Sequence, residues 1–180
     1  MSGTGERAAF NPPLLFRRAQ AEDATELTEI AQAAKRHWGY PTEWMEAWRE
    51  ELTITAEMIR RHQVGVAELG GKIIGTYSLI NDAGGWHLEH FWLQPAHIGR
   101  GLGRALFAEA VRQARALGLS ELRIKSDPNA EPFYLKMGAV RTGLEVCQLL
   151  GKIRREVPLL SYRVPAALDL ANPAGFAEGG

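Results

Sequence analysis

Three glycines at alternate positions, Gly99, Gly101 and Gly103, stand between a stretch rich in β-forming residues and a long amphipathic stretch. Glycine has no side chain, so a ligand can approach the backbone of such a turn closely. If a helix follows, the free N–H groups of its first turn lie at the positive end of the helix dipole and favour a phosphate or pyrophosphate. These residues therefore predict a phosphate-binding turn.

Two widespread nucleotide-binding motifs do not fit this spacing. The dinucleotide fingerprint G-x-G-x-x-G does not match, because the glycines fall at every second position. The phosphate-binding loop of nucleoside triphosphatases does not match either, because no Gly-Lys-Ser or Gly-Lys-Thr follows. A tight turn whose glycines serve packing alone stays open as the alternative.

The elements that would position this turn follow from the pattern around it. Residues 87–93 are rich in aromatic and large apolar residues, which predicts a strand, and Pro95 ends it because proline has no N–H to give to a sheet. Apolar residues then recur at helical spacing up to Gly118, which predicts a helix and its end. The predicted inward positions of this helix are Leu102, Leu106, Phe107, Ala110, Val111, Ala114 and Leu117.

The rest of the chain predicts alternating helices and strands. A strand at residues 14–19, a helix at 22–36 and a hairpin of 64–69 with 73–80 precede the central strand. Thr55 is expected to cap a short helix at 56–61, and Asn129 a helix at 130–137. Further strands are predicted at 122–125, 139–149 and 157–164, with a basic loop at 151–156.

The glycine turn resembles motif A of the GCN5-related N-acetyltransferase (GNAT) family, Gln/Arg-x-x-Gly-x-Gly/Ala. Gly101 and Gly103 occupy its glycine positions, and Ile98 stands where Gln or Arg is usual. The run A-x-x-F-Y-x-K-x-G at residues 130–138 resembles motif B of the same family. Two departures are Asp127, in the place of an Asn that contacts pantetheine, and Ala139, in the place of a Phe.

The resemblance implies an α/β (mixed α+β) domain with the GNAT fold. Its central, mostly antiparallel mixed sheet has helices on both faces and a V-shaped splay between two parallel strands, here the one ending at Leu93 and the one at 122–125. Acetyl-CoA lies in the gap, and the acceptor enters from the other side. The domain is predicted at residues 14–165, between a flexible N-terminal tail (1–13) and a weakly ordered C-terminal tail (166–180).

The resemblance also implies which residues bind acetyl-CoA. The Leu93 amide would donate to the thioester carbonyl as an oxyanion hole, and loop amides from Ile98 to Arg104 would hold the pyrophosphate. Arg100 and Arg104 either add charge-assisted contacts or are merely solvated. The predicted cofactor-binding residues are Phe91, Leu93, Ile98, Gly99, Arg100, Gly101, Leu102, Gly103, Arg104, Asn129, Phe133 and Tyr134.

Three residues are candidates for the chemistry of acetyl transfer. Tyr134 matches the family tyrosine that protonates the departing thiolate, and a phenol of ordinary pKa is a proton donor at neutral pH. The attacking amine must lose a proton, and Glu89 and His90 are the candidate bases. Strand alternation would place Glu89 with Phe91 and Leu93 on one face, and His90 on the other. Only one of the two can easily face the acceptor, and the resemblance favours Glu89, because an acidic residue on this strand is common in the family. A structural carboxylate or a water chain stays open.

The acceptor is expected to meet Trp38, Tyr40 and Glu89. Trp38, Tyr40, Trp44 and Trp48 form either an aromatic wall for an apolar or cationic acceptor or part of the core. Residues 154–155, both arginines, either recognise an acidic acceptor or are a solvated loop. The predicted function is N-acetylation of a small-molecule or amino-acid amine. The alternatives are a peptide or protein N-acetyltransferase and a non-catalytic CoA-binding regulatory domain.

Composition limits the remaining possibilities. The 180 residues are 46% hydrophobic and 23% charged, as in one globular domain. Lys+Arg and Asp+Glu both number 21, which argues against a nucleic-acid partner. Cys147 is the only cysteine, and the five histidines lack metal-ligand spacing, so neither a disulfide nor a metal is expected. Without an apolar run or a signal-peptide core, a cytoplasmic protein with no membrane partner is predicted, and a homodimer stays open.

Overall fold

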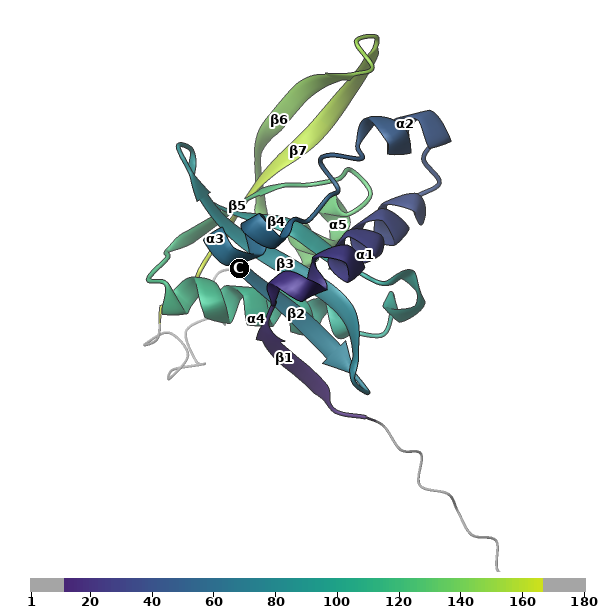
Figure 1. The fold of residues 1–180 in the computed structure, drawn as a ribbon. Coiled ribbons are helices and arrows are strands. Elements are labelled where there is room, and N and C mark those ends of the chain that lie inside the picture. Colours follow the sequence, from purple (N-terminus) through teal and green to yellow (C-terminus); the bar gives the residue numbers. More distant parts are fainter. Residues whose placement is uncertain (1–11, 167–180) are drawn as a thin grey trace, which may run out of the picture.

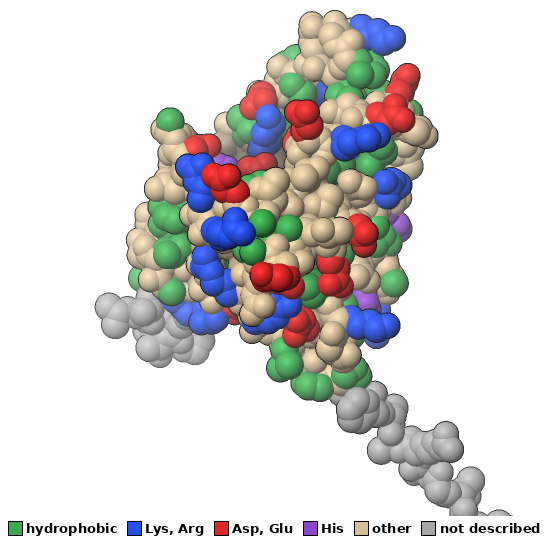
Figure 2. Space-filling view, in the orientation of Figure 1, with side chains coloured by type: hydrophobic (Ala, Val, Ile, Leu, Met, Phe, Trp, Pro, Cys, Tyr) green, Lys and Arg blue, Asp and Glu red, His purple; other side chains and the backbone are tan. Residues whose placement is uncertain are grey.

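The computed structural model describes residues 12–166, which form one seven-stranded sheet with helices on both faces (Figure 1). Nearly all of both predicted tails, 1–13 and 166–180, lies outside the described residues. Lys and Arg side chains are interspersed with Asp and Glu on the face in Figure 2, rather than gathered by sign.

The strand order in the sheet is β1-β2-β3-β4-β5-β7-β6. All neighbouring strands are antiparallel except β4 and β5, which are parallel. This confirms the predicted mostly antiparallel mixed sheet. The strands are β1 (Leu14–Arg18), β2 (Gln63–Leu69), β3 (Lys72–Asp82), β4 (Gly85–Leu93), β5 (Glu121–Lys125), β6 (Val140–Leu149) and β7 (Ile153–Arg163).

The helices follow the predicted order closely. The Thr55 hydroxyl accepts a hydrogen bond from the Met58 N–H, which confirms its predicted role as a cap. The α-helices are α1 (Ala24–Arg36), α2 (Thr42–Ala47), α3 (Ala56–Arg61), α4 (Leu102–Ala116) and α5 (Glu131–Lys136), with short 3₁₀ turns at η1 (Ala21–Asp23) and η2 (Pro95–His97).

The two faces of the sheet have separate cores. On one face, Leu106 and Phe107 of α4 and Tyr134 of α5 pack against buried side chains of β3, β4 and β5. On the other face, Leu27 and Ile30 of α1 pack against β2 and β3. Of the inward positions predicted for α4, the last, Leu117, is wrong: it lies beyond the helix end and is 44% exposed.

The parallel strands β4 and β5 separate after a short contact. They pair only at His87 with Arg123 and at Leu88 with Ile124, although β4 continues to Leu93. Beyond this point the chain after β5 stays paired with β7 on its other edge, where the Ser126 N–H donates to the Pro158 carbonyl, and makes no further pair with β4. The predicted splay is therefore confirmed.

A β-bulge at His90 overturns the predicted alternation along β4. His90 has a φ of 46°, and the register with β3 slips between Thr76 and Ser78. The extra residue turns Phe91 to the α4 face, where Leu88 also packs, so Glu89 and Phe91 do not share a face. Sequence alternation assumes an unbroken ladder and could not show this.

Two other local predictions, one about a helix cap and one about a loop, are wrong. Asn129 does not cap the helix after it, because its side chain bonds to Tyr40 and Asp127 instead. The predicted loop at 151–156 is mostly strand, since β7 begins at Ile153 and pairs with Leu149. The long β6–β7 hairpin stands out from the rest of the molecule beside α2 (Figure 1).

Candidate active site

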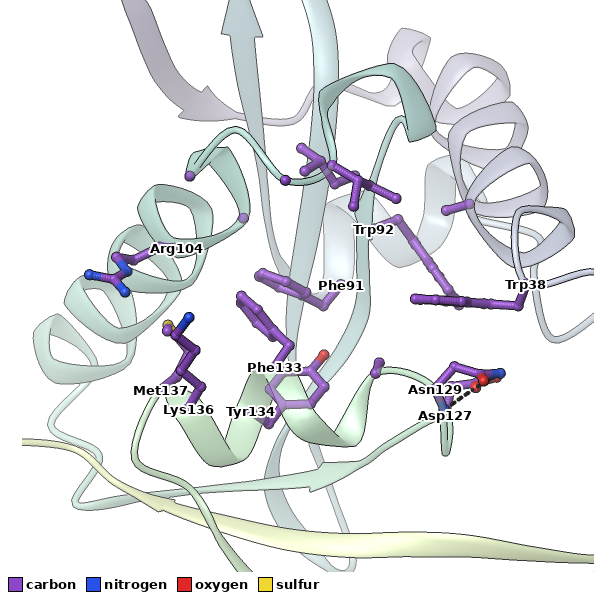
Figure 3. Close-up of a pocket in the computed structure, with 17 residues that line it drawn as sticks. Trp38, Phe91, Trp92, Arg104, Asp127, Asn129, Phe133, Tyr134, Lys136 and Met137 are labelled. Atoms are coloured by element: carbon purple, nitrogen blue, oxygen red, sulfur yellow. Dashed lines mark hydrogen bonds between the residues drawn. The ribbon is translucent and has the colours of Figure 1, made fainter.

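A cavity of about 370 Å³ lies between the glycine turn, the end of β4 and α5 (Figure 3). All the predicted cofactor-binding residues line it except Arg100 and Leu102. Leu102 packs at the edge of the α4 core, and a guanidinium nitrogen of Arg100 lies 3.4 Å from the His97 ring. The fold therefore gathers most of the predicted set around one opening.

Six consecutive backbone N–H groups, those of residues 99–104, find no acceptor within the described part of the chain. The last three begin α4, where the first N–H groups of any helix lack an internal partner. Gly99 and Gly101 both have a φ of 79°, which a residue with a side chain adopts only with strain. The amide of Ile98, predicted to belong to this set, instead donates to the Pro95 carbonyl at 3.2 Å. The turn thus presents a row of donors that suits an anion such as a pyrophosphate.

Aromatic side chains form the floor of this cavity. The rings of Phe91 and Phe133 stack at 5.7 Å, and a Cβ at Gly103 would lie 3.5 Å from the Phe133 ring. Tyr134 lies beside them and is buried, with its hydroxyl directed toward the middle of the cavity (Figure 3).

The environment of Tyr134 keeps its phenol protonated. Burial raises the pKa of Tyr134, and the negative charge of Asp127 raises it further. No hydrogen bond joins the Tyr134 hydroxyl to any group among residues 12–166. The hydroxyl can therefore donate a proton to a group that enters the cavity.

A second cavity, of about 310 Å³, lies across the splay from the first. Six charged side chains line it, which are Lys35, Glu51, Glu89, Lys125, Asp127 and Arg155. Both cavities share five residues at the splay, which are Phe91, Trp92, Asp127, Ala130 and Tyr134. A molecule in either cavity can therefore reach the same point.

Glu89 and His90 both line the second cavity but differ in their partners. A hydrogen bond from the His87 ring at 2.9 Å lowers the pKa of Glu89, against the opposing effect of burial. Burial lowers the pKa of His90, which therefore stays neutral. The His90 Nδ1 accepts a bond from the Trp92 indole at 3.4 Å, so the proton of the neutral ring is on Nε2. The lone pair of His90 is thus engaged, whereas Glu89 is ionised.

A buried ion pair connects α1 to the loop after β5. The Lys35 ammonium lies 2.5 Å from the Asp127 carboxylate, and their side chains are only 9% and 7% exposed. Asp127 also accepts bonds from the Tyr40 hydroxyl at 2.9 Å and from the Asn129 backbone N–H. The Lys35 charge and these bonds outweigh burial and lower the pKa of Asp127. Burial and Asp127 in turn raise the pKa of Tyr40 to about 12.

The four aromatic residues for which an acceptor-binding wall or a core role was predicted lie in two different places. Tyr40, Trp44 and Trp48 pack together, with ring centroids 5.0 to 5.7 Å apart. The chain's own cations cover these rings: Lys35 lies 4.2 Å from the Trp48 centroid. Trp38 is not in this cluster and lines the first cavity instead, opposite the predicted acceptor side.

Comparison with known proteins agrees with this architecture. Residues 26–149 match the family model described as an acetyltransferase (GNAT) domain. The chain belongs to the GNAT acetyltransferase family. As a member it is an N-acetyltransferase with acetyl-CoA as the acyl donor.

Individual relatives share the fold at low identity. The glucosamine 6-phosphate N-acetyltransferase of Trypanosoma brucei brucei is 31% identical over 99 residues, which are 49% of this chain and 67% of that protein. A GCN5-related N-acetyltransferase structure from Rhodopseudomonas palustris superposes with a TM-score of 0.70 at 24% identity, over 85% of this chain and 96% of that one. The structure of the PaiA N-acetyltransferase of Thermoplasma acidophilum, in complex with coenzyme A, superposes with a TM-score of 0.64 at 21% identity, over 84% of this chain and 99% of that one.

Sequence reasoning missed several residues of the second cavity or their partners. Lys35 falls four residues after Ala31 on the apolar stripe of α1, and a charge on such a stripe is a signal of a buried ion pair. Asp127 was visible as a departure from motif B, but its partners were not. Nothing in the sequence singled out Glu51 or Cys147 as residues that line the second cavity.

Two further features bear on ligands. Within residues 12–166, no group of three or more His, Cys, Asp or Glu side chains could hold a metal ion. No helix in the same range is long and apolar enough to cross a membrane.

Proposed function

We propose that the protein acetylates a primary amine of a small molecule or amino acid by direct attack of the amine on acetyl-CoA. The observation that supports this most is the meeting of the two cavities at Tyr134. The donor would occupy the cavity at the glycine turn, with its pyrophosphate on the N–H groups of residues 99–104. The acceptor would occupy the second cavity, whose volume of about 310 Å³ suits a small molecule.

In this mechanism the amine nitrogen bonds to the thioester carbonyl carbon and the carbon–sulfur bond then breaks. The oxyanion that forms on the carbonyl oxygen accepts a bond from the Leu93 amide. The departing thiolate takes the Tyr134 hydroxyl proton. The proton lost by the amine passes to Glu89, directly or through water, because Glu89 is ionised at neutral pH.

The test is a panel of amines assayed for release of CoA, followed by chromatography so that the Cys147 thiol does not interfere. The panel includes amino acids, polyamines and amino sugars, glucosamine 6-phosphate among them because a relative carries that name. Acetylation of one or more of these amines above buffer hydrolysis is the expected result.

Two controls separate the alternatives. Faster acetylation of a peptide library than of the metabolite amines would favour a peptide or protein acetyltransferase. Binding of acetyl-CoA in calorimetry with no turnover on either set would favour a regulatory domain. No calorimetric response to millimolar acetyl-CoA would refute the proposed donor site itself.

A further inference from the structure

We propose that the acceptor is an anionic amine, a primary amine whose molecule also carries a carboxylate or phosphate group, and that Arg155 binds that group. This inference rests on the proposed function and narrows its substrate class. It follows from the charges that line the second cavity and from which of them are already paired.

Most charged groups of the second cavity have a partner within the protein. Lys35 pairs with Asp127, and Lys125 pairs with Glu145 at 2.5 Å. Glu89 receives its bond from His87. Pairs of this kind satisfy one another and leave little charge to offer a ligand.

Arg155 is the exception among the cations that line this cavity. No carboxylate among residues 12–166 lies within 4.0 Å of its guanidinium. The polar contact it makes is a long one, 3.5 Å to the Tyr40 hydroxyl. A guanidinium carries five N–H donors, so most of those of Arg155 remain available.

Aromatic packing holds this guanidinium in place. Its central carbon lies 4.5 Å from the Trp48 ring centroid, 5.5 Å from that of Tyr40 and 5.6 Å from that of Trp44. Stacking on rings covers the face of the planar group and leaves its N–H edge for a ligand. A guanidinium fixed in this way loses little freedom when it binds a carboxylate or phosphate in bidentate fashion.

The neighbouring arginine provides an internal contrast. Arg154 points to the other side of β7, where it pairs with Glu156 at 2.8 Å and is 67% exposed. Arg155 lies opposite Cys147 in the hairpin register, and both line the second cavity. The sequence alone does not distinguish these two arginines, but as neighbours in a β-strand they point to opposite faces.

The second cavity also offers a place for the amine. Glu89 lines it near the splay, and Glu51 is a second carboxylate of the lining, with no ion pair among the described residues. Arg155 is joined to the splay through Tyr40, whose hydroxyl donates to Asp127. An acceptor with its anion on Arg155 can therefore extend its amine toward Tyr134.

The experiment compares matched amines, one with the anionic group and one in which a neutral group replaces it. Each amino acid is assayed against its carboxamide, and aminoalkyl phosphates are assayed against the corresponding amino alcohols. We expect the anionic member of the best pair to have a kcat/KM at least about 10-fold higher. The carboxylate and phosphate arms show which anion the site takes.

Variants then assign the preference to Arg155. Arg155→Gln should raise KM for the anionic acceptor by about 10- to 100-fold, leave KM for acetyl-CoA unchanged and leave the neutral analogue unaffected. Arg155→Lys should recover part of the loss, because it keeps the charge without the fork. Arg154→Gln is the matched control and should change neither constant. Melting temperatures of all three report whether the variants are folded.

Equal use of charged and neutral amines by the unchanged protein would overturn this inference and leave the proposed function standing. An equal loss on both members of a pair in Arg155→Gln would also overturn it, because that result indicates a structural role. Binding of acetyl-CoA without turnover of any amine would refute the proposed function, and the inference with it.

Discussion

The buried Lys35–Asp127 ion pair gives the sharpest prediction about stability. Replacing Lys35 by Met keeps the length and apolar stem of the side chain but removes the ammonium. Asp127 would then keep its bonds from Tyr40 and Asn129 but lose its counter-charge in a place where its side chain is 7% exposed. The free energy of unfolding must fall, because a buried carboxylate without a cation is costly.

The size of the effect follows from the burial of the pair. Removing one partner of a buried ion pair destabilises proteins by about 3–5 kcal/mol. The remaining hydrogen bonds to Asp127 place this case near the lower end, at about 3 kcal/mol. The matched control is Lys125→Met, whose pair with Glu145 has side-chain exposures of 54% and 45%. That exposed pair should contribute only about 0–1 kcal/mol.

Equilibrium unfolding in urea measures both variants. Lys35→Met should move the midpoint down by about 1 M or more with an unchanged slope, and Lys125→Met should move it little. The pKa of Asp127 is lowered in the folded protein, so its stabilising effect is complete above the ordinary carboxyl pKa and is lost as pH falls through the lowered value. Removing Lys35 raises this pKa, so the difference in unfolding free energy between variant and parent should narrow as pH falls through the raised pKa of the variant. Equal losses in the two variants at neutral pH would refute the reasoning from burial.

Three further substitutions, two of them with a matched control variant, test the proposed mechanism and donor site. Tyr134→Phe should lower kcat by about 100-fold with little change in acetyl-CoA affinity, whereas Tyr162→Phe, which removes another partly buried phenol, should leave steady-state rates intact. Gly101 and Gly118 have φ values of 79° and 76°, so replacing either by Ala should lower the free energy of unfolding by about 1 kcal/mol. Calorimetry should find weaker acetyl-CoA binding only for Gly101→Ala. Glu89→Gln should lower kcat/KM by about 100-fold and remove the acid limb of the pH profile of kcat/KM. In the parent this limb lies below the ordinary carboxyl range, because the pKa of Glu89 is lowered. An acid limb that is unchanged in the variant would exclude Glu89 as the base.

Local patterns in the sequence were enough for most of the helices and strands and for the glycine turn. The apolar stripe of α4 and the cap at Thr55 involve residues within a few positions of each other, so their geometry depends on short-range rules. The same holds for the glycine turn, whose free N–H groups follow from a helix start after glycines. Motif order then placed Tyr134 in the same cavity as this turn.

The second cavity depends on contacts between distant segments, and only the tertiary structure decided it. Lys35 and Asp127 are 92 positions apart, and their pairing exists because α1 packs on β4 and thereby brings Lys35 to the loop after β5. The bulge at His90 reversed the face of Phe91, and the pleat of β7 divided residues 154–155 into a solvent-facing and a cavity-facing arginine. A sequence records the charge of each side chain, but burial and partners set what that charge does, and these are properties of the packed fold.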